Sequence, residues 1–263
     1  EDELEKLFKK YNFIGVIHLA ALSDVESSNL NPDKYYKNNV VGSLNLLQKM
    51  IKYNIKNIVF SSSAAVYGNP FYTPIDEEHS KLPINPYGDT KLTVEKLIYN
   101  FSNAFNINFI SLRYFNVSGS IYESNIGEAH KPETHIIPLA LDSAYKNSCF
   151  KIFGADYQTN DGTCIRDLVH IKDLSNAHLL SFKKLLSSEI NEFINIGGGS
   201  GLSVLEVLKC VKKITNLEFS IEICGRRVGD PDVLVSKIHK SKEILMWEPK
   251  YSDINSIIFD SWE

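Results

Sequence analysis

Apolar positions along the first 116 residues follow two different periods. Residues 1–12 repeat apolar side chains at the spacing of one helix face, whereas 15–21 form a short continuous apolar run typical of a buried strand. Helical spacing returns over 32–53, where one face is formed by Tyr36, Val40, Leu44, Leu47 and Ile51. Strands are predicted at 57–60 and 109–114, with a further helix between them. This alternation predicts right-handed βαβ units around a parallel sheet.

The pattern loosens after about residue 116. Residues 117–165 have the composition of loops, with a short strand at 150–153. Further strands are predicted at 192–196 and 219–224, and Ser203-Val204-Leu205-Glu206 is a capping box that opens a helix between them.

Two domains follow from this change of pattern. Residues 1–116 are expected to form a doubly wound parallel sheet, and 117–263 a smaller mixed α/β domain. Within the second part, 164–185 is expected to pack back on the first domain.

Composition excludes several classes of protein. With 28 basic and 32 acidic residues the net charge is −4, and no basic stripe is visible, so we expect no nucleic-acid partner. The longest apolar stretch, 13–22, is too short to cross a bilayer, and the first residues lack the features of a signal peptide. The four cysteines form no CxxC pair. We therefore expect reduced thiols and a cytoplasmic protein without a membrane anchor.

Tyr87 and Lys91 lie four residues apart on a predicted helix and therefore on one face. A phenol titrates near pH 10, so it needs a shift of roughly 3 pKa units to act as a base near neutral pH. An ammonium group one helical turn away lowers the pKa of a phenol. The spacing equally fits a surface lysine beside a half-buried tyrosine.

The surrounding strand ends favour the catalytic interpretation. Ser61-Ser62-Ser63 closes one strand, His18 to Ala21 closes the strand before it, and 112–116 closes the one after it. The carboxyl ends of parallel strands share one edge of a sheet, which is where ligands of such folds bind. Small and polar groups from each strand are thus predicted to meet in one crevice.

The sequence resembles the extended short-chain dehydrogenase/reductase family, and within it the UDP-glucose 4-epimerase branch. The resemblance covers nearly the whole chain and is carried by residues 16–21, 35–40, 61–68, 87–91, 112–116, 132–138, 152–154, 161–167 and 226–231. It implies a Rossmann-like fold, NAD as the cofactor, a homodimer, and the interconversion of UDP-glucose and UDP-galactose through a transient 4-ketose.

The resemblance also implies roles for individual residues. Tyr87 corresponds to the base at the 4-hydroxyl, Lys91 to the residue that lowers its pKa and holds the nicotinamide ribose, and Ser63 to a hydrogen-bond partner of the sugar. The positions that match NAD contacts are Leu19, Ala20, Ala21, Leu22, Ser23, Asn38, Ser63, Tyr87, Lys91 and Phe115. Those that match UDP-sugar contacts are Ser63, Tyr87, Asn116, His135, Phe153, Arg166, Arg227 and Asp230.

Arg166 and Arg227 also fit a pyrophosphate on chemical grounds. Only four of the 28 basic residues are arginines, and a guanidinium binds phosphate oxygens with two parallel hydrogen bonds. The alternative for both is a surface ion pair. No metal is expected, because the seven histidines show no ligand spacing.

One family feature is absent from these residues. The opening strand, its Gly-x-x-Gly-x-x-Gly turn and the carboxylate that holds the adenosine ribose do not occur before Glu1. Gly197 to Gly201 does not replace this turn, because it does not fit Gly-x-Gly-x-x-Gly, with Leu at position 202. Residues 1–263 alone are therefore expected to be poorly soluble and not to retain NAD.

Two other functions remain open at this point. A nucleotide-sugar 4,6-dehydratase or decarboxylase shares the Tyr/Lys pair but needs an extra carboxylate where Ala64 and Ala65 stand. A truncated, inactive nucleotide-sugar-binding homologue is the second alternative.

Overall fold

The computed structural model describes residues 2–227 and 230–263 as two compact units. The first comprises 1–69, 77–114 and 177–195, and the second comprises 70–76, 115–176 and 196–263. Among the described helices, none is both long and apolar enough to span a membrane.

A four-stranded sheet forms the centre of the first unit, in the order β1 (Val16–His18), β2 (Asn57–Ser61), β3 (Asn108–Tyr114) and β7 (Asn191–Ile196). β1, β2 and β3 run parallel, with Val59 opposite Ile110. The alternation of strands and helices therefore gives the predicted parallel sheet, and its carboxyl edge gathers the ends of β1, β2 and β3.

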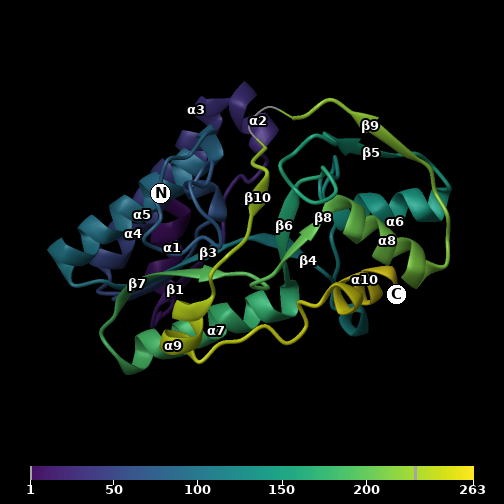
Figure 1. The fold of residues 1–263 in the computed structure, drawn as a ribbon. Helices are drawn as coiled ribbons and strands as arrows, with labels where there is room; N and C mark the ends of the chain where they lie inside the picture. The colour runs from purple at the N-terminus through teal and green to yellow at the C-terminus, as the bar shows by residue number, and fades with distance from the viewer. Residues whose placement is uncertain (1, 228–229) are drawn as a thin grey trace. The chain divides into compact units, whose positions relative to one another are not determined.

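Helices cover both faces of this sheet (Figure 1). α1 (Asp2–Lys10), α4 (Gly42–Lys52) and α5 (Pro86–Phe105) lie on one face, and α7 (Ile171–Ser187), which enters this unit at Ala177, lies on the other. Between the sheet and the first three helices, a core is formed by Phe8, Leu47, Met50, Ile58, Phe60, Val94, Ile98 and Phe109. This core fixes α5 against the sheet.

The helix predicted over 32–53 differs from expectation. It is divided into α3 (Pro32–Tyr35), a π-helical segment (Tyr36–Val41) and α4, and a short helix α2 (Val25–Leu30) precedes it. The wider π turn rotates the buried face, because its hydrogen bonds reach one residue further along the chain. The buried residues are consequently Tyr35, Asn39, Ser43, Leu47 and Met50, and the predicted core residue Tyr36 is exposed.

The second unit contains two small sheets. In one, β6 (Ile165–His170) pairs with β4 (Asn116–Ser118), β8 (Gly201–Ser203) and β10 (Val233–Leu234); in the other, β5 (Phe150–Phe153) pairs with β9 (Ile221–Cys224). The helices are α6 (Ile136–Lys146), α8 (Val204–Thr215), α9 (His239–Leu245) and α10 (Ile254–Trp262). α8 begins with the predicted capping box at Ser203.

α6 corrects the expectation of an irregular region over 117–165. Its third residue is Pro138, which the first turn of a helix accepts because the N–H groups there have no intrahelical partner. The buried side chains Ile137, Ala140, Leu141 and Ala144 hold it on the core that also contains Leu168 and Val211.

Candidate active site

Tyr87 and Lys91 lie in the first two turns of α5. The helix starts at this point because the Asn85 side chain accepts a hydrogen bond from the Gly88 N–H at 2.8 Å and Pro86 occupies the first helical position. Both side chains are buried, with 7% of Tyr87 and 2% of Lys91 exposed. Lys91 Nζ lies 5.8 Å from the centre of the Tyr87 ring, so the predicted pair exists as a close contact.

The Lys91 ammonium is anchored at the end of β2. Its Nζ donates to the Ser61 carbonyl oxygen at 2.6 Å and lies 5.0 Å from the centre of the Phe60 ring. Burial lowers the pKa of Lys91 to about 8, against an opposing effect of Glu95. An ammonium has three N–H donors, and among the described residues Ser61 is its only hydrogen-bond acceptor. The remaining donors fit the hydroxyls of a ribose, which is the part of NAD expected here.

Ser63 forms a hydrogen bond with the Tyr87 phenol. Burial raises the pKa of Tyr87 above its ordinary value and the nearby Tyr114 adds to this effect, whereas the Ser63 hydrogen bond lowers it. Ser63 is held by its place at the start of a 3-10 turn (Ala64–Val66), where its Oγ accepts from the Ala65 N–H at 3.1 Å. The three predicted catalytic side chains are thus brought together at the end of β2 and the start of α5.

The segment Leu19–Ser23, predicted to contact NAD, follows β1 and is held by Asn39. The Asn39 side chain accepts from the Leu22 N–H at 2.8 Å and from Asn38 Nδ2 at 3.0 Å, and it donates to the Leu22 carbonyl at 3.0 Å. Its second N–H reaches Thr90 on α5 at 3.0 Å. Asn38, the predicted cofactor contact, is exposed. Asn39 was not predicted from the sequence, because it lies off the predicted apolar face of 32–53 and the π-helical segment brings it to the buried side.

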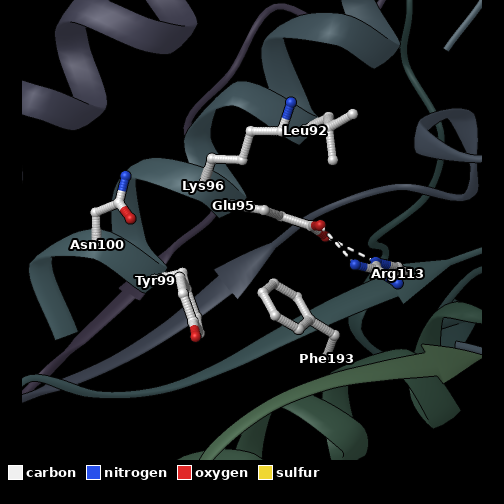
Figure 2. Close-up of a pocket in the computed structure, with 7 residues that line it drawn as sticks. All are labelled: Leu92, Glu95, Lys96, Tyr99, Asn100, Arg113 and Phe193. Atoms are coloured by element: carbon white, nitrogen blue, oxygen red, sulfur yellow. Dashed lines mark hydrogen bonds and ion pairs between the residues drawn. The ribbon is translucent and has the colours of Figure 1, made fainter. Parts of the chain in front are cut away.

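Behind α5, Glu95 and Arg113 form a buried ion pair (Figure 2). The carboxylate accepts two hydrogen bonds from Arg113, at 2.7 and 2.9 Å, and others from the hydroxyls of Ser62 at 2.6 Å and Ser111 at 3.1 Å. The pair forms one wall of a pocket of about 370 Å³ that Phe193 also lines. Glu95 thereby ties α5 to the ends of β2 and β3.

Arg166 and Asp230 lie together in the second unit. Arg166 Nη1 donates to the carbonyls of Ile165 at 2.9 Å and Pro231 at 2.8 Å. Its Nη2 lies 3.3 Å from Asp230 Oδ1, yet it is buried without a hydrogen-bond partner among the described residues. A buried guanidinium N–H in this state is a ready donor to an anion. Tyr157, which was not predicted, has a buried hydroxyl that also lacks a hydrogen-bond partner within the described part of the chain.

Arg227 and Phe153 also meet in this unit. The guanidinium carbon of Arg227 lies 3.9 Å from the centre of the Phe153 ring, and the arginine is exposed. The neighbouring Arg226 is engaged differently, because it forms an ion pair with Asp156 at 2.7 Å and stacks on Tyr157. Of the two adjacent arginines, Arg227 therefore fits the predicted phosphate contact better.

Three further predicted site residues, Phe115, Asn116 and His135, belong to the second unit. Phe115 is buried and its N–H donates to the Ile196 carbonyl at 2.9 Å, and Asn116 begins β4 opposite Leu168. His135 occupies the N-cap position of α6 without a side-chain capping bond, and its Nδ1 lies 2.8 Å from a Glu133 carboxylate oxygen.

One observation concerns metal binding. The expectation that no histidines cluster is wrong for His130 and His135, which together with Glu128 place possible ligand atoms within 4.8 Å of one another. The three residues are largely exposed, and their ring nitrogens already contact carboxylates of the same loop. The absence of a metal stays a prediction.

Comparisons with known proteins show the family of the chain. A family model described as the NAD dependent epimerase/dehydratase family matches residues 1–197. The chain is 42% identical over 260 residues to the UDP-glucose 4-epimerase of Lacticaseibacillus casei. This alignment covers 98% of this chain and 78% of that protein.

Two solved structures are similar over nearly the whole chain. The UDP-glucose 4-epimerase from Brucella ovis in complex with NAD has a TM-score of 0.95 and 38% identity, covering 99% of this chain and 81% of that one. The UDP-glucose 4-epimerase from Thermotoga maritima with UDP-glucose has a TM-score of 0.86 and 31% identity, covering 99% and 80%. The predicted resemblance and the α/β fold class are confirmed.

Proposed function

Since the chain belongs to the NAD-dependent epimerase/dehydratase family, we propose that it interconverts UDP-glucose and UDP-galactose by inverting C4 of the hexose, with NAD as cofactor. The isomerase activity and the cofactor predicted from the sequence are confirmed by its relatives, which are UDP-glucose 4-epimerases, one of them in complex with NAD. The observation that carries the assignment to particular residues is the buried Tyr87 with the buried Lys91 ammonium 5.8 Å from its ring centre.

Tyr87 removes and returns the proton of the 4-hydroxyl. Its phenol is buried, so it needs a local source of positive charge to lose its proton near neutral pH. The Lys91 ammonium supplies this charge from a fixed position, and the Ser63 hydrogen bond acts in the same direction. When bound, NAD supplies the acceptor and donor of the C4 hydride and a positively charged ring.

Residues of the second unit hold the nucleotide part of the substrate. The buried Nη2 of Arg166 and the exposed guanidinium of Arg227 bind the pyrophosphate, because both present N–H donors in a planar fork. The Phe153 ring stacks on the Arg227 guanidinium and holds it in place. Asn116, His135 and Asp230 complete the UDP-sugar contacts implied by the family, whereas Leu19 to Ser23, Asn38 and Phe115 contact NAD.

The dehydratase and decarboxylase alternatives are not favoured. Both reactions need an extra carboxylate, and the corresponding positions hold Ala64 and Ala65. The surroundings of these two alanines are also closely packed, since Ala64 is buried and a Cβ added to Gly88 would lie 2.5 Å from the Ala65 carbonyl oxygen. The start of α5 thus packs directly on the turn after β2.

We also propose a cytoplasmic homodimer in which residues 1–116 mainly hold NAD and 117–263 mainly hold the UDP-sugar. The four cysteines are free thiols, which supports a reducing compartment. Light scattering of the purified protein measures its mass in solution. The mass of a dimer is expected, and the mass of a monomer would contradict the proposal.

The activity is tested by following UDP-galactose turnover to UDP-glucose in the full protein supplied with NAD. We expect turnover by the wild-type protein, and lower turnover in each of the variants Ser63→Ala and Tyr87→Phe. Retained UDP binding without turnover in the wild-type protein would instead favour the inactive nucleotide-sugar-binding homologue.

A further inference from the structure

Ser61 and His178 form a buried pair that the mechanism above does not use. Ser61 Oγ and His178 Nε2 are 2.6 Å apart, and only 1% of Ser61 and 8% of His178 is exposed. His178 lies on α7, and α7 covers the opposite face of the sheet from α5. A buried polar contact is costly to leave unmade, so His178 fixes the side chain of Ser61.

Ser61 in turn contacts two groups of the candidate active site. Its carbonyl oxygen accepts the 2.6 Å hydrogen bond from Lys91 Nζ, and its hydroxyl is hydrogen-bonded to Tyr114, the neighbour of Tyr87. The rings of Tyr114 and His178 also lie 6.3 Å apart at an angle of 55°. Ser61 therefore connects α7 with Lys91 through its backbone carbonyl, and with Tyr114 near Tyr87 through its hydroxyl.

We propose that His178 is a positioning residue for epimerisation, which holds Ser61 so that the Ser61 carbonyl fixes the Lys91 ammonium and the Ser61 hydroxyl orients Tyr114 beside Tyr87. This inference rests on the proposed function. His178 acts on Lys91 through Ser61, whose carbonyl oxygen is the only hydrogen-bond acceptor of the Lys91 ammonium among the described residues.

The expected signature is a change in proton transfer. Lys91 is flanked by Glu95 from its own helix and by His18 from β1, and Tyr87 is flanked by Tyr35 and Tyr114. None of these groups is altered by substituting His178. If the Ser61 carbonyl shifts, the ammonium moves from its position beside the phenol and stabilises the phenolate less. The acid limb of the kcat profile then moves to higher pH, because a larger fraction of Tyr87 stays protonated.

The test compares variants of one helix in the full, NAD-loaded protein. His178→Phe removes the contact to Ser61, and His178→Gln retains a polar group near the position of Nε2. Ser181→Ala is the matched control, because it removes another buried hydrogen bond, 2.7 Å from Ser181 Oγ to the Ala177 carbonyl, from the same helix. We expect His178→Phe to lower kcat about tenfold, as for the loss of one hydrogen bond, with little change in KM. His178→Gln should restore most of the loss, and Ser181→Ala should leave kcat and its pH profile unchanged.

Ser61→Ala provides a second route to the same answer. It removes the hydroxyl but retains the carbonyl, so it should show the same displaced acid limb, and combining it with His178→Phe should cost no more than either change alone. Additive losses, or a His178→Phe profile like that of Ser181→Ala, would overturn the positioning role while leaving the epimerase function intact. If His178→Phe does not fold, Ser61→Ala and His178→Gln decide by the same criteria. A wild-type protein without turnover would instead overturn the proposed function.

Discussion

Removing Arg113 should destabilise the protein more than any single surface change. Arg113 and Glu95 are 2% and 1% exposed, and the guanidinium donates two hydrogen bonds to the carboxylate. In Arg113→Met the buried carboxylate keeps, among the described residues, only the hydroxyls of Ser62 and Ser111 as hydrogen-bond donors. Breaking a buried ion pair by removing one partner costs about 3–5 kcal/mol, since an uncompensated charge remains.

This cost translates into a large thermal shift. For a protein of this size, about 1 kcal/mol corresponds to roughly 2–4 °C, so the unfolding midpoint should fall by about 10 °C. Calorimetry or circular dichroism at pH 7 measures it. The double variant Glu95→Leu/Arg113→Met should recover most of the loss, because the carboxylate left without its partner is also removed and Tyr67 keeps its 2.6 Å hydrogen bond to Asn195. The reasoning is refuted if Arg113→Met lowers the midpoint by only a few degrees, or if the double variant is as unstable as the sum of the singles.

Three further substitutions test the site and the pH dependence of stability. Tyr87→Phe should lower kcat at least about 100-fold while UDP affinity stays within a few-fold, and near-normal turnover would remove Tyr87 from the role of base. Arg227→Lys should weaken UDP binding in a calorimetric titration by about 1–3 kcal/mol, because the planar fork that stacks on Phe153 is lost; the control Arg226→Lys should change it little, and equal effects would contradict this assignment. Burial and Lys91 lower the pKa of His18 to about 4. Its contribution to stability is therefore complete above about pH 6.5 and is lost as the pH falls toward 4. His18→Gln should reduce the loss between pH 7 and 4.5 by about 2.5 kcal/mol in urea unfolding, and an unchanged loss would disprove this.

The sequence predicts those parts of the fold that depend on local periodicity. β2 and β3 lie within one residue of their predicted positions, and α5 begins at Pro86, where a helix was expected from Tyr87. The same periodicity places Tyr87 and Lys91 on one helix face and Ser63 at a strand end. The candidate catalytic cluster could therefore be predicted from spacing and topology, together with the resemblance.

The rest depends on contacts that are distant in sequence. The Ser61–His178 pair joins residues separated by 117 positions, and no local pattern distinguishes His178 from a core histidine. The π-helical segment before α4 changes which side chains are buried. Its wider turn rotates the side chains that follow it relative to those of a regular helix. α6 was not predicted because 117–165 was interpreted as loop-rich, although Pro138 lies in the first turn of a helix, which accepts proline.

The bonding of Asn39 has a consequence for the thermodynamics of ligand binding. Its amide oxygen accepts two hydrogen bonds and its amide nitrogen donates two, so the group is saturated within the protein. The main chain at Leu22 is thus restrained in the folded protein, and its conformational entropy is lost during folding instead of on association. A dinucleotide that reaches Leu19–Ser23 meets a preorganised surface, and little of its binding free energy is consumed in ordering it. Asn39→Asp would keep the shape but replace two donors by an acceptor, which would shift that entropic cost from folding to binding.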